Sequence, residues 1–107
     1  MFTIGYPSLV ILRVFNNTEK IIENITFLYE NTGEVTSIGI KNLKPNKSKQ
    51  TGLSTINAKN ADLKMSILDK SYLLKESITK EYKRTLIINI NDIALDGNIT
   101  FTLKEEE

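Results

Sequence analysis

Four lysines lie close together in the segment KNLKPNKSKQTG, residues 41–52 of this 107-residue chain. Lys41, Lys44, Lys47 and Lys49 are two or three positions apart, and clustered ammonium groups raise the local concentration of anions. Such a patch would contact phosphate or an acidic protein. The net charge of the chain is only +1, and no aromatic side chain is interleaved for base stacking, which is typical of a solvated loop and disfavours nucleic acid. We take these four lysines as a candidate interaction loop.

A second polar segment, NDIALDGN at residues 91–98, carries side-chain oxygens that suit a hard cation such as calcium. These oxygens belong to Asn91, Asp92, Asp96 and Asn98. Their spacing does not match an EF-hand loop, and the Asp96-Gly97 pair is explained by a hairpin turn. We therefore expect no metal or other cofactor in this chain.

The chain has no cysteine and no histidine. Thiolate nucleophiles, cysteine-ligated zinc, iron–sulfur clusters, Ser-His-Asp chemistry and imidazole metal sites are thereby excluded. Carboxylate catalysis would need a recognisable pair, whereas the aspartates at positions 62, 69, 92 and 96 all lie at predicted turns, which aspartate favours on its own account. We expect a protein that is not an enzyme.

The elements that would position these residues are short strands. Apolar residues recur at every second position, as expected for strands with one buried and one solvated face. The runs are Val10, Leu12 and Val14; Ile25, Phe27 and Tyr29; Thr36, Ile38 and Ile40; Leu63, Met65 and Ile67; Leu86, Ile88 and Ile90; and Ile99, Phe101 and Leu103. Gly33 predicts a hairpin within residues 25–40, and Asp96-Gly97 predicts another, pairing the last two runs antiparallel. Pro45 and Gly52 predict a loop over residues 41–52, with strand signal resuming at residues 53–56.

Residues 69–84, DKSYLLKESITKEYKR, fit two structures. A helix is supported by a capping Asp69 and by Leu74, Ile78 and Tyr82 at spacing four, which would share one helical face. A strand is supported by Tyr72, Leu74 and Ile78 at even spacing, with Glu76 as the exception. Turn signals every eight to twelve residues elsewhere favour strand or irregular structure, and the helix remains an alternative.

About seven short alternating strands in one chain of this length predict an all-β fold. We expect a single domain over residues 1–107, built as a small antiparallel immunoglobulin-like β-sandwich, with one short helix near residues 69–84 as the open alternative. The missing cysteines and tryptophan separate it from antibody-type domains.

The segments LRVFNNTEKIIENITFLYENTGEV and IKNLKPNKS, within residues 12–50, resemble the FxLYD-type bacterial immunoglobulin-like domain. In that family a strand ending in Asn is followed by a strand with an aromatic-Leu-Tyr-acidic end and then by a loop centred on proline. Here the acidic end is Phe27-Leu28-Tyr29-Glu30, without the spacer between Phe and Leu. The resemblance implies a small sandwich that serves as an accessory or binding module, and it carries over no catalytic residue.

Two functions follow. The first is a non-enzymatic protein-interaction module whose edge strand or loop end docks a protein partner or a second copy of the chain. The alternative is a carbohydrate- or ligand-binding accessory domain of a larger or secreted protein, with a stacking surface formed by Tyr6, Tyr29, Tyr72 or Tyr82.

The first fifteen residues lack the basic region and cleavage pattern of a secretory signal, and no run is long and apolar enough for a membrane span. We expect a cytoplasmic protein without a membrane partner, or a secreted or cell-surface one if the chain is a fragment. Lysine outnumbers arginine twelve to two, which is typical of an AT-rich genome and suggests a bacterium or its phage.

Overall fold

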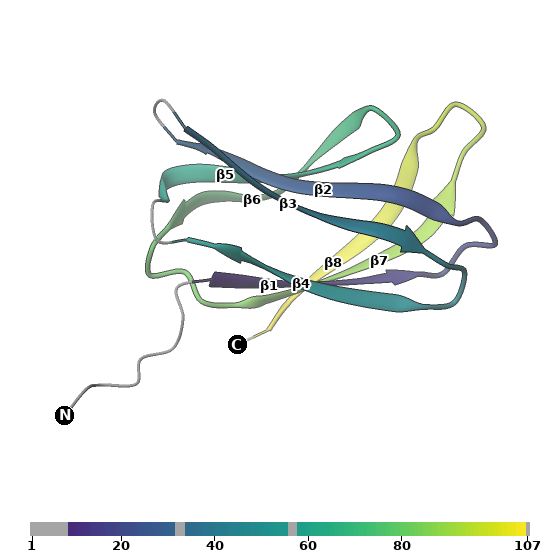
Figure 1. Ribbon diagram of the computed structural model, residues 1–107, viewed down its shortest axis with the longest axis horizontal. Helices are drawn as coiled ribbons and strands as arrows, with labels where there is room; N and C mark the ends of the chain where they lie inside the picture. The colour runs from purple at the N-terminus through teal and green to yellow at the C-terminus, as the bar shows by residue number, and fades with distance from the viewer. Residues whose placement is uncertain (1–8, 32–33, 56–57, 107) are drawn as a thin grey trace.

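The computed structural model describes residues 9–31, 34–55 and 58–106, and these contain eight strands. They are β1 (Leu9–Asn16), β2 (Ile22–Asn31), β3 (Glu34–Leu43), β4 (Ser48–Ser54), β5 (Lys59–Ile67), β6 (Lys70–Thr79), β7 (Thr85–Ile93) and β8 (Ile99–Glu106). Sheet A has the order β4-β1-β7-β8 and sheet B the order β3-β2-β5-β6. The two sheets pack face to face (Figure 1). The all-β sandwich is confirmed, with eight strands instead of about seven.

The loop predicted over residues 41–52 is wrong in extent, and the strand expected at residues 53–56 begins earlier, as β4, and ends at Ser54. β3 continues to Leu43 and β4 begins at Ser48, so that only residues 44–47 connect them. β4 is polar because it lies at the edge of sheet A, where it pairs antiparallel with β1 and places Lys49 beside Val14. Because most of its side chains are exposed and polar, β4 lacks the alternating apolar residues from which strands were predicted.

The sequence predicted antiparallel pairing throughout, but one pair of strands is parallel. β1 lies between β4 and β7 in sheet A, and its pairing with β7 is parallel, with Ile11 beside Thr85 and Val14 beside Ile88. The two predicted hairpins are present: β2 pairs antiparallel with β3, and β7 with β8. The parallel pair arises because β1 and β7 are distant in sequence and no hairpin constrains their direction.

The helix alternative for residues 69–84 is wrong. Residues 70–79 form β6, which pairs antiparallel with β5. The spacing of Leu74 and Ile78 equals two strand periods, and the exception at Glu76 has a local cause: the register between β5 and β6 shifts, and Ser77 has a φ of 55°. This irregularity lets Glu76 stay in solvent while the leucine and isoleucine on either side are buried.

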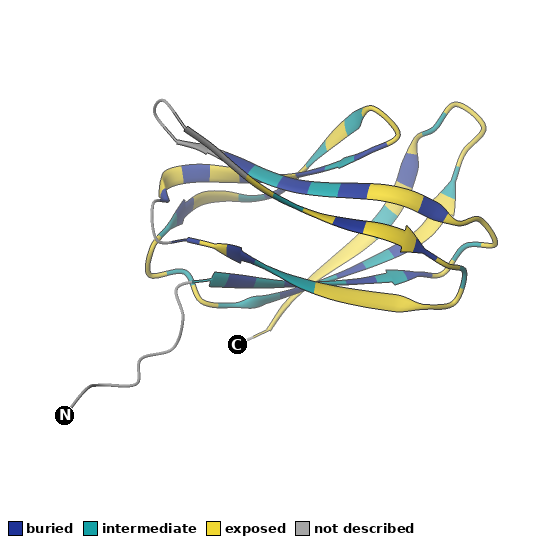
Figure 2. Cartoon of the chain, in the orientation of Figure 1, coloured by how far each residue is buried: buried dark blue, intermediate teal, exposed yellow. Residues whose placement is uncertain are grey.

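The core lies between the two sheets and consists of the inward-facing member of each alternating pair. Its largest fully buried side chains are Tyr29, Phe27, Leu12, Ile25, Leu43, Leu53, Leu63, Met65, Ile67, Ile78, Leu86 and Ile88. Buried and exposed residues alternate along the ribbon (Figure 2). Phe101, expected in the core, is half-buried against its margin. Within the described residues there is no helix long and apolar enough to cross a membrane.

Candidate interaction surface

The four candidate lysines lie where the chain passes from sheet B to sheet A. Lys41 belongs to β3, Lys44 and Lys47 to the connection, and Lys49 to β4, and all four side chains are exposed. The Lys49 ammonium donates a hydrogen bond to the carbonyl of Lys41. A tight turn at Pro45 joins Lys44 to Lys47, since the Lys47 amide donates to the Lys44 carbonyl at 3.2 Å. The predicted loop therefore exists as a shorter turn that presents Lys44 and Lys47.

This turn is anchored by Asn16, one of two buried polar residues among those described. The backbone N–H of Asn16 donates to the backbone carbonyl of Lys47 at 2.9 Å, and the backbone N–H of Asn46 donates to the backbone carbonyl of Asn16 at 2.8 Å. The side-chain oxygen of Asn16 accepts from the amide and hydroxyl of Thr18 at 3.0 and 2.7 Å. These bonds satisfy a polar group at 0% exposure and fix the β1–β2 and β3–β4 connections against each other.

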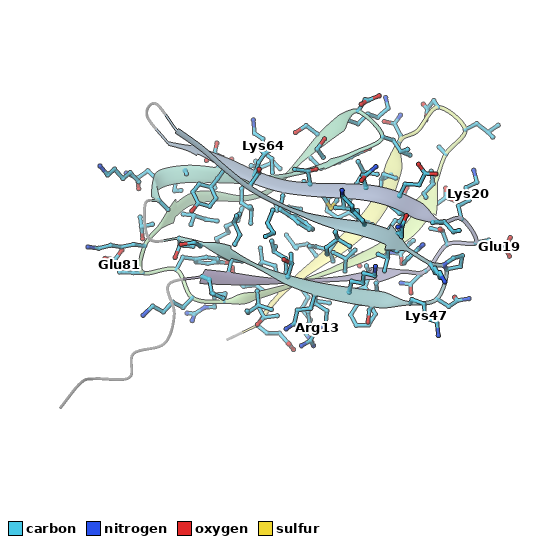
Figure 3. The ribbon with its side chains drawn as sticks, in the orientation of Figure 1. Arg13, Glu19, Lys20, Lys47, Lys64 and Glu81 are labelled. Atoms are coloured by element: carbon cyan, nitrogen blue, oxygen red, sulfur yellow. The ribbon has the colours of Figure 1, made fainter. Side chains whose placement is uncertain are left out.

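Four connections meet at one end of the sandwich: β1–β2 (residues 17–21), β3–β4 (44–47), β5–β6 (68–69) and β7–β8 (94–98). Figure 1 shows them together, and Figure 3 labels Lys20, Glu19 and Lys47 there. We call these four segments, with the strand residues that adjoin them, the loop end.

The loop end exposes large apolar side chains. Ile21 is 56% exposed, Leu68 55% and Leu95 102%, and Leu73 and Leu103 are the other two exposed large hydrophobic residues in the described part of the chain. Isolated exposed apolar side chains are ordinary, whereas three large ones at one end of a small domain mark a candidate contact surface.

The turn that carries Leu68 has an unfavourable backbone. Leu68 and Asp69 have φ values of 52° and 63°, the left-handed values that a two-residue hairpin loop requires at both central positions. Asparagine and glycine are the residues that usually occupy such turns, and leucine is a poor substitute. An apolar side chain 55% exposed on an unfavourable backbone is a candidate for contact with another molecule.

A shallow hollow of about 500 Å³ lies beside these tips, lined by Ile21, Ile22, Glu23, Asn24, Leu68 and Asp69. Both carboxylates are on exposed residues, and neither forms an ion pair with any residue that the structure describes. The hollow thus combines apolar walls with unneutralised negative charge, a combination that suits the aliphatic stem and charged head of a lysine.

Charge is unevenly distributed across the loop end. Residues 41–54 contain four lysines and no acidic residue, and they connect the β3 and β4 edges of the two sheets. Toward the β6 and β8 edges, the acidic residues are Asp69, Asp92 and Asp96, with Lys70 the nearby cation. Glu23 lies between the two sides, on β2 beside β3, and Glu19 and Lys20 lie in the β1–β2 connection. The loop end therefore has a lysine side and an acidic side, with the β1–β2 connection between them.

The 91–98 segment serves as a turn. The Asn98 amide donates to Asp96 at 3.0 Å, a bond that holds the pKa of Asp96 below its ordinary value, and Gly97 has a φ of 88°. No group of three metal-ligating side chains occurs in the regions described.

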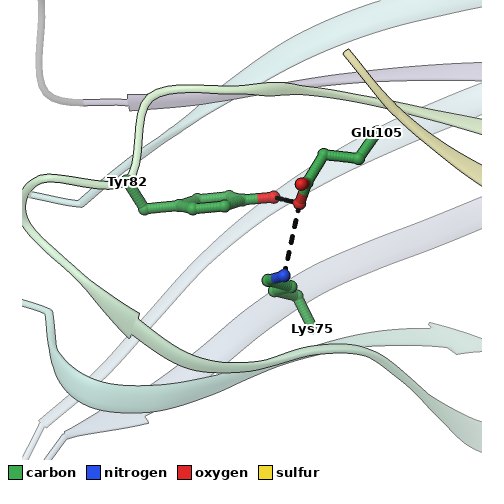
Figure 4. Close-up of polar contacts among 3 residues, drawn as sticks. All are labelled: Lys75, Tyr82 and Glu105. Carbon is green, nitrogen blue, oxygen red and sulfur yellow. Dashed lines mark hydrogen bonds and ion pairs between the residues drawn. The ribbon is translucent and has the colours of Figure 1, made fainter. Parts of the chain in front are cut away.

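The edge strands β6 and β8 are bridged by side chains. Lys75 and Tyr82 both contact Glu105 (Figure 4). The Tyr82 hydroxyl donates a hydrogen bond to the Glu105 carboxylate, and the Lys75 ammonium lies 3.4 Å from the same carboxylate. The Lys75 ammonium also lies 5.6 Å from the centroid of the Tyr82 ring. At the other end of β8, the Tyr72 hydroxyl accepts from the Ile99 amide at 2.9 Å, and its ring packs edge-on against Phe101. These contacts obstruct the approach of another strand to β8.

These contacts also weigh against the predicted aromatic binding surface. Tyr29 is 1% exposed, and its hydroxyl donates to the Ser54 carbonyl across the core. Tyr72 and Tyr82 are half-buried in the bridges just described, and Tyr6 lies outside the described residues. No described tyrosine is left as a flat exposed platform for sugar stacking.

A second apolar area is the solvent face of sheet A, where Leu9, Ile11, Phe15 and Ile87 are partly exposed. Arg13 on the same face of β1 donates two hydrogen bonds to the Gln50 side chain, at 2.8 and 3.0 Å. This face exposes its apolar side chains less than the loop end does, and no complementary charge accompanies it.

The residues that define the loop end were not identified from sequence. Ile21 precedes Ile22, and Leu68 follows Ile67, so each is the second member of an adjacent apolar pair next to a turn. Because neighbouring strand residues face opposite sides, one member of each pair must point away from the core. An adjacent apolar pair beside a predicted turn is therefore the sequence signal that could have identified Ile21 and Leu68.

Comparisons with known proteins add the following. No family model matches the chain, and no curated protein matches it. One solved structure, described as an NMR structure of the protein from Eubacterium rectale, is similar with 12% sequence identity and a TM-score of 0.48, over 90% of this chain and 88% of that one. This likeness carries no argument about function.

Proposed function

We propose that the chain is a non-enzymatic protein-interaction module that docks its partner through the loop end. The single observation that carries the proposal is the grouping of Ile21, Leu68 and Leu95 at that end, exposed to 56%, 55% and 102%. Exposed apolar groups in loops on a rigid scaffold are the usual material of binding surfaces. The bridged β6 and β8 edges favour the loops over strand addition as the docking element.

The immunoglobulin-like description is kept as part of this proposal and is supported by the two packed sheets. The strand order is a departure: the first two strands share a sheet in immunoglobulin domains, whereas β1 and β2 lie in different sheets here. The proposal includes a bacterial or phage origin and a cytoplasmic location, on the sequence grounds given above.

The test is site-specific cross-linking in the source cell. A photoreactive benzoylphenylalanine at position 95 is compared with one at position 73, because Leu73 is also an exposed leucine but lies on β6, away from the loop end. We expect covalent adducts of defined mass from position 95 and none from position 73. Absence of adducts at position 95, or equal adducts at both positions, would overturn the proposal.

A further inference from the structure

We propose that the partner at the loop end is a second copy of this chain, and that two loop ends meet about a twofold axis. The proposal rests on the proposed function and specifies its partner. The observation behind it is the uneven charge of the surface: Lys44 and Lys47 lie on one side and Asp69, Asp92 and Asp96 lie on the other. Glu23 lies between them on β2, in the lining of the hollow.

A twofold axis lying in the contact plane, between the two sides, places the lysine side of each copy opposite the acidic side of the other. An isologous contact of this kind is self-complementary and closes at two copies. A contact between like sides would instead repel. The same surface thus supplies both members of each attractive pair.

The apolar tips fit the same arrangement. Leu68 lies on the acidic side, and Leu95 belongs to the β7–β8 connection next to it, because the Leu68 side chain lies near Gly97. Each tip then faces the partner copy's 44–47 turn, whose lysine stems and Pro45 offer apolar surface while the ammonium groups reach the carboxylates. Ile21, between the two sides, lies near the axis.

This geometry gives the hollow an occupant. Glu23 and Asp69 line it together with Ile21 and Leu68, and its walls therefore match both halves of a lysine side chain. In the isolated copy these carboxylates have no ion-pair partner among the described residues. In the pair they receive one from Lys44 or Lys47 of the second copy.

The test uses the purified chain in sedimentation velocity, at concentrations up to about 500 µM, because a contact of this size is expected to be weak. We expect a monomer–dimer equilibrium whose dissociation constant rises when salt increases from about 50 to about 500 mM. The double variants Lys44→Glu/Lys47→Glu and Glu23→Lys/Asp92→Lys should each raise that constant by at least about tenfold. Within the part of the chain that the structure describes, none of these four side chains forms a hydrogen bond or an ion pair.

The matched control is Lys80→Glu/Lys83→Glu, at two exposed lysines in the connection between β6 and β7. It changes the net charge by the same amount as Lys44→Glu/Lys47→Glu. It should leave the dissociation constant unchanged. Mixing the two loop-end variants should restore a heterodimer, because each then supplies the charge that the other has lost. Thermal unfolding of every variant confirms that the monomer is intact.

A chain that stays monomeric at every concentration would overturn the inference, as would a dimer that the control weakens as much as the loop-end variants do. Failure of the mixed variants to associate would also overturn it. The cross-linking experiment keeps the two proposals separate: adducts at position 95 to a different protein would support the interaction module and contradict self-association.

Discussion

Asn16 and Leu43 end strands that belong to different sheets, and the side-chain amide of Asn16 donates to the Leu43 carbonyl at 3.0 Å. The same amide group donates to the Lys20 carbonyl at 2.7 Å. One fully buried side chain thus joins sheet A to sheet B at the loop end and sets the positions of the turn that carries Lys44 and Lys47.

Replacement of this residue should be costly. Asn16→Ala leaves two carbonyls and the Thr18 amide without their partner in a buried site, and we expect a loss of about 2–4 kcal/mol in the free energy of unfolding, measured by urea denaturation. The control is Asn17→Ala, since Asn17 is exposed and its side chain makes one bond, to Asn91 at 3.1 Å. Its loss should stay below about 1 kcal/mol. Equal effects of the two substitutions would contradict a central role for Asn16.

Substitutions in the β5–β6 turn should stabilise the monomer and weaken its association with a second copy. Leu68→Asn combined with Asp69→Gly supplies residues that accept positive φ, and we expect thermal unfolding to show a gain of about 1 kcal/mol. If Leu68 serves association, the same variant should weaken the dimer while stabilising the monomer. A variant that loses stability would show that the Leu68 side chain supports the fold.

The glycines Gly52 and Gly97 should respond oppositely to alanine. A Cβ at Gly52 would lie 3.4 Å from a methyl group of Leu9, an ordinary contact, so Gly52→Ala should be neutral or stabilising by about 0.5 kcal/mol. At Gly97 the φ of 88° disfavours any side chain, and Gly97→Ala should cost about 1 kcal/mol or more. Chemical denaturation of both variants measures the contrast, and a shared sign would contradict it.

The Tyr82–Glu105 bond should make stability depend on pH at both extremes. The hydrogen bond from Tyr82 holds the pKa of Glu105 below its ordinary 4.5, so this contribution is present above that pH and is lost as the pH falls through the lowered pKa. Burial and the same bond raise the pKa of Tyr82 above 10, so its contribution is present below pH 10 and is lost at higher pH.

Tyr82→Phe removes the hydroxyl and keeps the ring over which Lys75 lies. We expect the free energy of unfolding to fall near neutral pH and its dependence on pH to flatten at both extremes, measured by urea denaturation across the pH range. A profile parallel to that of the unchanged protein would show that the bond does not contribute in solution.

The fold was predictable where each strand has one clear apolar face. Burial alternates along all of β1 and over most of β2, β5 and β7, and alternation follows directly from the two-residue period of a strand. The start of β4 was predicted five residues too late, at residue 53, because an edge strand needs few apolar residues. β6 was ambiguous because a spacing of four residues fits both a strand and a helix, and because the irregularity near Ser77 leaves Glu76 exposed between the buried Leu74 and Ile78. Pairing between β1 and β7 depends on contacts between distant segments, which no local pattern encodes.

The candidate surface was predictable only in part. The four lysines were identified, and the structure brings Lys44 and Lys47 to a solvent-facing turn. Their relation to Glu23 and Asp92 could not be read from the sequence, because it arises when turns from four separate connections meet at one end. Ile21, Leu68 and Leu95 were not identified, since a residue's exposure depends on where its strand ends.

The parallel pairing of β1 with β7 constrains how the molecule is made. During synthesis the apolar segment of β1 emerges early, yet it can join β7 only after residues 85–93 have been added. The β2–β3 hairpin can form much sooner, because its strands are neighbours in sequence, whereas the apolar side chains of β1 stay exposed until β7 is available. Folding should therefore finish late and slowly, and chaperones would most readily hold the nascent chain through β1.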